Sequence, residues 1–255
     1  MTRSYAHLCA RDEAAEEFQN LKNKGLLNTD LKPMPYDEMI AIPVIEGDLI
    51  LNFENVAKHN PHDNLNAIIE NPPKKWEKLG DMVIFQNGTQ TNGWPLQKVA
   101  DALGVTRIAI QSEIDPGIER RSQLKLIYGD GGWVIHRENF VEYEFDATAV
   151  MFSSGNVTER RRMGELQIEG EIIVDAYAGI GYYTLQFLVR GKAKHVHSCE
   201  INPDSTLALR KGLERNEVAN NCSIYEGDNR KTMKQLSGIA DRVILGLIPS
   251  SMNTW

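Results

Sequence analysis

A glycine-containing turn in the second half of the chain has the residue types of a nucleotide-binding site. The segment DAYAGIGYY, Asp175 to Tyr183, follows the apolar run EIIV and precedes TLQFLV, so we expect a strand before the turn and a helix after it. Gly179 and Gly181 carry no Cβ, so the backbone can approach a ligand closely. The N-terminus of the helix adds exposed N–H groups. Two glycines also mark ordinary tight turns, so the signal depends on its position between strand and helix.

Acidic and amide residues end the next two predicted strands. KHVHSCE ends at Glu200, where a carboxylate can accept both hydroxyls of a ribose. CSIYEGDN ends with Asp228 and Asn229, where an acid and an amide can contact adenine. Each residue alone is equally typical of a solvated loop or a helix cap. Together with the glycine turn, they favour a cofactor that contains a nucleoside.

The choice between two such cofactors rests on the third position of the glycine motif. NAD requires a cradle for its pyrophosphate, usually with a third glycine or alanine, whereas this chain has Thr184 there. S-adenosylmethionine carries no phosphate, so two glycines and the acid Asp175 suffice. The sequence therefore favours S-adenosylmethionine.

The elements that position these residues alternate regularly from Glu171 onward. Strand and helix patterns follow one another there, which predicts a doubly wound parallel α/β sheet with ligands at the carboxyl ends of its strands. Short apolar clusters broken by Pro, Gly and Asn between Pro33 and Gly129 predict a smaller α+β domain with a helix at 95–104. The alternating segment that follows, GGWVIHRENFVEYEFDATAVMF, predicts either paired strands or one strand and its connection. We therefore expect a polar helical segment at 1–30, the α+β domain at 31–150 and the Rossmann-like domain at 151–255.

Composition excludes several classes of protein. The longest apolar runs of the 255 residues fall far short of the roughly 20 that span a bilayer, and the N-terminus lacks an apolar signal core. The three cysteines are too few and too widely spaced for a disulfide framework or a zinc knuckle. His195 and His197 share a strand face but lack a third ligand nearby in sequence. We expect a cytoplasmic protein that binds no metal and no membrane.

Further motifs carry a resemblance to a known family. The segments MFSSGNVTERRR at 151–162, VDAYAGIGYYTL, CEINP, GDNR and DRVILGLIPSS at 241–251 together resemble the tRNA wybutosine-synthesizing protein 2 family. The resemblance extends from about Leu21 to Ser251 and is strongest after Met151. It implies a class I methyltransferase-like fold, related to the tRNA guanosine methyltransferases that modify the base beside the anticodon.

The resemblance also implies a reaction and a set of site residues. Members transfer the 3-amino-3-carboxypropyl group of S-adenosylmethionine to a tricyclic guanosine derivative, 4-demethylwyosine, in tRNA(Phe), and release 5′-methylthioadenosine. We expect tRNA(Phe) as the partner of a monomer, with no catalytic residue assigned. The predicted contacts to S-adenosylmethionine are Ser153, Arg160, Asp175, Tyr177, Gly179, Gly181, Glu200, Asp228 and Asn229.

The end of the chain departs from the family pattern. The relatives that methylate guanosine have an Asn-Pro turn after the fourth strand, whereas this chain has Gly246 to Ser250, GLIPS, which offers no acid or amide to a base. The family sequence is no longer recognisable from Met252, so we expect a doubly wound sheet that is truncated at its C-terminus, with four strands. Two alternatives stay open: a tRNA guanosine methyltransferase, and an inactive fragment that binds the cofactor.

A local basic patch is expected despite the net charge of −7. Because phosphate contacts require cations, we expect the tRNA to meet a set of basic residues in the second half of the chain. These are Arg160, Arg161, Arg162, Lys192, Lys194, Arg210, Lys211 and Arg215.

Overall fold

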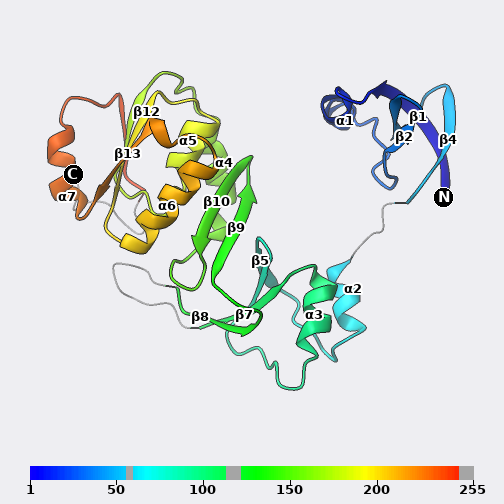
Figure 1. Cartoon of the computed structure of the whole chain (residues 1–255), viewed down its shortest axis with the longest axis horizontal. Helices are drawn as coiled ribbons and strands as arrows, with labels where there is room; N and C mark the ends of the chain where they lie inside the picture. The colour runs from blue at the N-terminus through cyan, green and yellow to red at the C-terminus, as the bar shows by residue number, and fades with distance from the viewer. Residues whose placement is uncertain (56–59, 113–121, 247–255) are drawn as a thin grey trace. The chain divides into compact units, whose positions relative to one another are not determined.

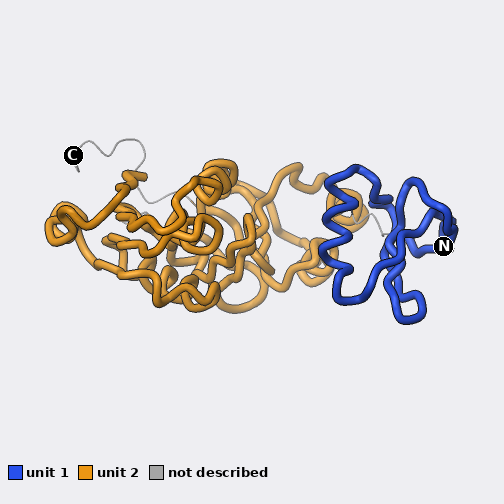
Figure 2. The backbone as a smooth tube through the Cα atoms, turned by 90° about the horizontal axis from the view of Figure 1, so that it is seen from above, with its two compact units in different colours: residues 1–60 blue, residues 61–255 orange. Residues whose placement is uncertain are grey.

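The computed structural model describes residues 1–55, 60–112 and 122–246. It divides into two compact units, Met1–Asn60 and Pro61–Trp255, which are coloured separately in Figure 2. Among the described residues, none of the helices combines the length and the apolar character needed to cross a membrane.

The first unit is an antiparallel sheet with one helix, and it corrects the prediction for residues 1–30. The strand β1 (Thr2–Ala10) lies between β3 (Met39–Val44) and β4 (Leu49–Phe53), and β2 (Met34–Tyr36) pairs with β3. Among the described residues of this unit, only α1 (Ala14–Asn23) forms an α-helix. The helical prediction is therefore wrong for the first strand, because its polar residues are held by two distant partner strands rather than by an apolar pattern of their own.

The second unit begins with a small mixed sheet. Its strands are β5 (Trp76–Leu79), β6 (Met82–Phe85), β7 (Arg107–Gln111) and β8 (Leu124–Tyr128), in that order, with only β6 and β7 parallel. The helices α2 (Pro61–Asn66) and α3 (Leu96–Leu103) bury Leu65 and Val99 in a common apolar cluster. The predicted helix is confirmed, and it ends at Gly104 in the left-handed conformation with φ 61°.

A hairpin connects the mixed sheet with the parallel sheet. The strands β9 (Trp133–Glu138) and β10 (Val141–Asp146) pair antiparallel, which confirms the predicted paired strands. The turn between β5 and β6 lies directly against β9, because a Cβ on Gly80 would come within 2.4 Å of the Ile135 carbonyl oxygen. On its other side the hairpin runs beside α6 (Pro203–Arg215), as Figure 1 shows.

The parallel sheet confirms the predicted fold class. β11 (Ile172–Asp175), β12 (His195–Glu200), β13 (Cys222–Glu226) and β14 (Arg242–Ile244) are all parallel in the order β13-β12-β11-β14. On one face, α5 (Thr184–Val189) and α6 bury Leu185 and Leu209 against Ile173. On the other, α7 (Asn229–Thr232) and the 3-10 helix η3 (Met233–Leu236) follow β13, and Leu236 packs on Val174. Helices on both faces make the sheet doubly wound.

The segment ahead of β11 supplies the second part of the candidate site. The 3-10 helix η1 (Ser154–Asn156) continues into α4 (Val157–Gly164), which packs beside α5. The predicted domain boundary between 150 and 151 falls immediately before this segment and lies inside the second compact unit. It stays a prediction.

Candidate functional site

The glycine turn is fixed by its neighbours at both glycines. Gly179 and Gly181 have φ values of 56° and 95°, which favour glycine. A Cβ on Gly181 would lie 2.7 Å from Leu209 of α6, so this glycine permits close packing of α6. The N–H of Gly179 donates to Glu200 Oε2 over 2.7 Å. Contacts within the protein therefore hold the turn in this shape.

Glu200 lies where the sequence predicted it, at the carboxyl end of β12. Besides the bond from Gly179, its Oε1 accepts the N–H groups of Ile201 (3.0 Å) and Asn202 (2.8 Å). Burial raises the pKa of Glu200, and these backbone donors oppose the rise. Three N–H groups hold the carboxylate in one orientation beside the turn, which is what a ligand-binding acceptor requires.

Asp175 lies under the turn rather than on its surface. Its side chain is fully buried, Oδ2 accepts the Thr184 hydroxyl at 2.9 Å, and Oδ1 lies 3.4 Å from the N–H of Tyr177. Burial raises its pKa to about 6, although both bonds oppose the rise. Thr184, which the sequence counted only as a missing glycine, also contacts the Ser198 hydroxyl at 2.8 Å. Asp175 and Thr184 thus connect β11 to the start of α5.

The residues after β13 are close to the turn but are already engaged. The Asp228 carboxylate caps α7 through the Arg230 N–H at 3.0 Å and pairs with the Arg230 guanidinium at 2.6 Å, which lowers the pKa of Asp228 to about 2. The buried Asn229 donates its amide to the Ala176 carbonyl at 2.8 Å. Asn229 therefore ties the end of β13 to the strand end that carries the turn.

The segment around Ser153 forms the other wall of the candidate site. Arg160, predicted to contact the cofactor, is only 1% exposed. Its Nε and Nη2 donate to the two carboxylate oxygens of Glu138 at 2.6 and 2.7 Å, and its Nη1 donates to the Ser153 carbonyl at 2.7 Å. Every guanidinium nitrogen is thus used inside the protein. In this structure Arg160 positions the loop that carries Ser153.

Two residues of this wall were not predicted from the sequence. Glu138, at the end of β9, is the partner of Arg160 and has a side chain only 10% exposed. Tyr182 donates its hydroxyl to the Met151 carbonyl at 2.5 Å, and the Arg160 guanidinium lies 5.6 Å from its ring centroid. Glu138 stands on a strand whose alternating pattern gave no chemical signal. Tyr182 belongs to the quoted turn, so its place in DAYAGIGYY was a signal that the prediction did not use.

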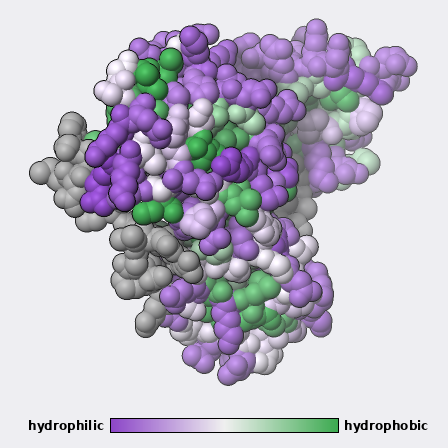
Figure 3. Space-filling view, turned by 60° about the vertical axis from the view of Figure 1, so that its left-hand side comes forward, coloured by the Kyte–Doolittle hydropathy of each residue, from purple (hydrophilic) through white to green (hydrophobic). Residues whose placement is uncertain are grey.

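The predicted basic patch is largely compensated by acids. Arg161 pairs with Glu165 and Arg162 with Glu159, at 2.9 and 2.7 Å. On α6, the three predicted cations Arg210, Lys211 and Arg215 pair with Glu226, Glu144 and Glu142. Arg160 is buried, so from this position it cannot face phosphate as predicted. Hydrophilic side chains predominate on the face seen in Figure 3.

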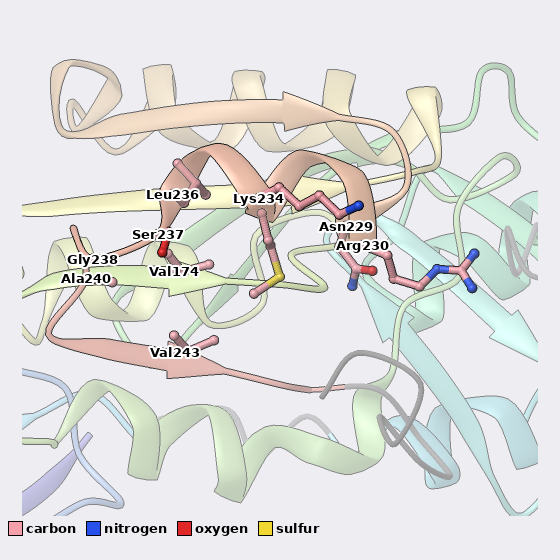
Figure 4. Close-up of a pocket in the computed structure, with 10 residues that line it drawn as sticks. Val174, Asn229, Arg230, Lys234, Leu236, Ser237, Gly238, Ala240 and Val243 are labelled. Atoms are coloured by element: carbon pink, nitrogen blue, oxygen red, sulfur yellow. The ribbon is translucent and has the colours of Figure 1, made fainter.

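A cavity of about 550 Å³ lies on the face of the parallel sheet that is covered by α7 and η3, opposite the face covered by α5 and α6. Figure 4 shows that Val174 and Val243 of the sheet face Leu236 and Lys234 of the α7–η3 segment across it. Among the nine predicted site residues, only Asn229 lines this cavity. It lies in a helix–sheet interface away from the other predicted site residues, so we place the candidate site at the glycine turn instead. Among the described residues there is no cluster of three or more potential metal ligands.

Comparisons with known proteins relate this geometry to a family. Residues 134–254 match the family described as the TRM5/TYW2 methyltransferase domain, and they include all nine predicted site residues. A human protein named tRNA wybutosine-synthesizing protein 2 homolog is 47% identical over 190 residues, 72% of this chain and 42% of that protein. The chain therefore spans less than half the length of this curated relative.

Two solved structures of TRM5/TYW2 proteins are similar in fold. *P. horikoshii* TYW2 in complex with MeSAdo is 30% identical, with a TM-score of 0.57, over 72% of this chain and 65% of that one. Trm5b from *Pyrococcus abyssi* is 25% identical, with a TM-score of 0.58, over 97% and 77%. The resemblance stated from the motifs is confirmed. The predicted turn after β14 lies, from Leu247 onward, outside the described residues.

Proposed function

We propose that this chain transfers the 3-amino-3-carboxypropyl group of S-adenosylmethionine to 4-demethylwyosine in tRNA(Phe). The observation that carries the proposal is the 47% identity to a relative named tRNA wybutosine-synthesizing protein 2 homolog. The MeSAdo bound to the similar *P. horikoshii* protein supports an adenosine ligand for this chain as well.

The described residues fit S-adenosylmethionine in the following roles. Glu200 accepts a ribose hydroxyl at Oε2, because two of its three backbone donors occupy Oε1 and only one occupies Oε2. Asp228 and Asn229 lie toward the adenine, and the backbone at Tyr177 and Gly179 follows the nucleoside. The Ser153 hydroxyl has no hydrogen bond to another described residue, so it can serve the aminocarboxypropyl arm.

The reaction is a displacement at carbon. A nucleophilic carbon of the tricyclic base forms a bond to Cγ of the arm while the Cγ–S bond breaks. The electron pair of the broken Cγ–S bond stays on sulfur, so 5′-methylthioadenosine leaves as a neutral molecule. The base then loses a proton from the carbon that was alkylated. Which of the three carbons on sulfur reacts depends on which one faces the nucleophile. The protein's task is therefore to aim the arm at the tRNA.

Methyl transfer to guanosine in tRNA is the second candidate. The observation that favours it is the similarity to Trm5b, which extends over 97% of this chain, whereas the similarity to P. horikoshii TYW2 extends over 72%. The third candidate is a fragment that binds the cofactor without turnover, since the chain spans only 42% of the human relative.

The deciding experiment follows two labels of S-adenosylmethionine. The chain is incubated with precursor tRNA(Phe) and with S-adenosylmethionine labelled either in the methyl group or in the arm. We expect only the arm label to enter tRNA, with one methylthioadenosine released per transfer. Methyl label in tRNA with S-adenosylhomocysteine as product would establish the second candidate. Binding of S-adenosylmethionine without either transfer would establish the third.

Location and assembly complete the proposal. We propose a cytoplasmic monomer. Size-exclusion chromatography with light scattering measures the assembly, and a mass of two chains would contradict it.

A further inference from the structure

A half-buried glutamate outside the family-matched residues contacts Ser154, in the wall of the candidate site that carries Ser153. Glu77 lies on β5, and its Oε1 is buried without a hydrogen-bond partner among the described protein groups. Its carboxylate also accepts a hydrogen bond from the side chain of Ser154. Burial raises the pKa of Glu77, and Ser154, His136 and Arg160 oppose the rise. A buried acceptor without a donor costs free energy, so this oxygen calls for an explanation.

Glu77 is one of three side chains that hold the segment 151–154. Tyr182 donates to the Met151 carbonyl, Arg160 donates to the Ser153 carbonyl, and Ser154 contacts Glu77. Tyr182 and Arg160 use these groups to fix the backbone. Glu77 differs from both, because one of its oxygens is left over after the contact is made.

The charges around the segment favour a cationic ligand group there. Arg160 gives two nitrogens to Glu138, so its charge is already matched by a carboxylate at 2.6 Å. Glu138 also has His136 at 3.7 Å. Glu77 therefore adds a carboxylate that forms no ion pair with another described residue, although the charges of His136 and Arg160 act on it. A ligand carboxylate would be repelled at this position, whereas an ammonium supplies both the charge and the missing donor.

We propose that the free oxygen of Glu77 accepts a hydrogen bond from the ammonium group of the aminocarboxypropyl arm, beside Ser153 and Ser154. The inference rests on the proposed function, because it assumes S-adenosylmethionine as the ligand. It assigns the arm's recognition to its ammonium rather than to its carboxylate. It also gives the mixed sheet a part in the site, since β5 supplies the side chain.

The test compares three ligands on the wild-type chain and on Glu77→Gln. S-adenosylmethionine carries the ammonium and a charged sulfur, S-adenosylhomocysteine carries the ammonium and a neutral sulfur, and 5′-methylthioadenosine carries neither. Glutamine keeps the shape and the contact to Ser154 but removes the charge. By calorimetry we expect a fivefold to tenfold weaker affinity for the first two ligands and an unchanged affinity for the third.

Each other outcome overturns the inference in a distinct way. If Glu77→Gln loses affinity for S-adenosylmethionine alone, Glu77 lies near the sulfur. If it loses affinity equally for all three ligands, Glu77 is a structural residue. If it loses no affinity, Glu77 is not part of the site. Ser154→Ala is the matched control, because it breaks the contact to Glu77 but leaves the carboxylate in place, and it should not discriminate between the ligands. A wild-type chain that binds none of the three would instead contradict the proposed function.

Discussion

Two buried carboxylates beside the candidate site have pKa values that are shifted in opposite directions. Asp175, under the glycine turn, accepts hydrogen bonds from the Thr184 hydroxyl and from the backbone N–H groups of Tyr177 and Thr184, and burial raises its pKa to about 6. Burial acts in the same direction on Glu138, but hydrogen bonds from Arg160 and His136 outweigh it and lower the pKa to about 2. The hydrogen-bonding and charged groups around a carboxylate, rather than burial alone, therefore decide which protonation state it keeps.

The two walls also differ in how they are built. The glycine-turn wall consists of residues at the ends of adjacent parallel strands, held by backbone N–H groups. The Ser153 wall is held by side chains from β9 and α4, and its central contact is a buried ion pair. We therefore expect the first wall to respond to changes in ligand contacts and the second to respond to changes in the protein's own charges.

The largest expected effect comes from removing Glu138. Glu138→Ala leaves the buried Arg160 guanidinium without its counter-charge, which costs about 3–5 kcal/mol of unfolding free energy when one partner of a buried pair is lost. Urea unfolding followed by circular dichroism measures this. The control is Glu165→Ala, which breaks the exposed pair with Arg161 and should leave the midpoint almost unchanged. Equal effects of the two variants would contradict the difference between buried and exposed pairs.

The next effect is a pH dependence of opposite sign for the two carboxylates. The pKa of Asp175 is raised from 3.8 to about 6 in the folded state, so the folded protein binds the proton more tightly. Its contribution therefore makes stability fall as pH rises between these values, by up to about 3 kcal/mol. Asp175→Asn should lack this fall when urea unfolding is repeated from pH 4 to pH 7.

Glu138 should produce the reverse. Because its folded-state pKa is lowered from 4.5 to about 2, its contribution is complete above pH 4.5 and is lost as pH falls toward 2. For Asp175, the contradicting result is a free energy of unfolding that still falls between pH 4 and pH 6 in Asp175→Asn, because another group would then cause the fall.

The sequence allowed predictions about the glycine-turn wall but not about the contacts that hold the Ser153 wall. The strand-end positions of Glu200, Asp228 and Asn229 could be predicted because parallel strands bring their carboxyl ends together, so position in the chain determines position in space. Their contacts to a cofactor stay a prediction. The pairing of Glu138 with Arg160 was not found, since it joins a hairpin strand to a helix and no local pattern encodes it. The role predicted for Arg160 was a direct contact to the cofactor. Its burial against Glu138 shows why a residue type alone did not reveal what the side chain contacts.

The strand β1 was missed for a related reason. Its burial comes mainly from Ala6 and Cys9, and its place between β3 and β4 depends on partners that follow much later in the chain. An apolar period was therefore absent from the first ten residues, although they occupy the centre of a sheet. The four strands from β11 to β14 were found because helices cover both faces of the sheet and keep their apolar runs intact.

A smaller effect is expected on ligand affinity at the glycine-turn wall. Glu200→Ala removes the acceptor proposed for the ribose, and each charge-assisted bond contributes roughly 1.5–3 kcal/mol, so binding of S-adenosylmethionine should weaken at least about tenfold. Calorimetry on the folded variant measures it. The matched control is Glu226→Ala, the exposed acid that ends β13 and pairs with Arg210, which should leave the affinity unchanged. Unchanged affinity in Glu200→Ala would remove Glu200 from the ribose site.

The smallest expected effect extends the role of charge partners to the surface and to the proposed tRNA. Arg161 and Arg162 already pair with Glu165 and Glu159, whereas Lys192 and Lys194 are exposed and have no ion pair within the part of the chain that the structure describes. A phosphate contact by a cation releases counterions, so the logarithm of tRNA affinity should fall linearly with the logarithm of salt concentration.

The two pairs of cations can then be compared directly. Losing one phosphate contact reduces the salt slope by about one unit, so changing both lysines to alanine should reduce it by up to about two. Changing both arginines to alanine should reduce it less, because their glutamates compensate part of their charge before tRNA binds. Filter binding at several salt concentrations gives both slopes. A larger change for the arginine variant would mean that these pairs open on the tRNA. In that case, an ion pair within the protein would indicate what a charged residue does when the pair is buried, but not when the pair lies on the surface.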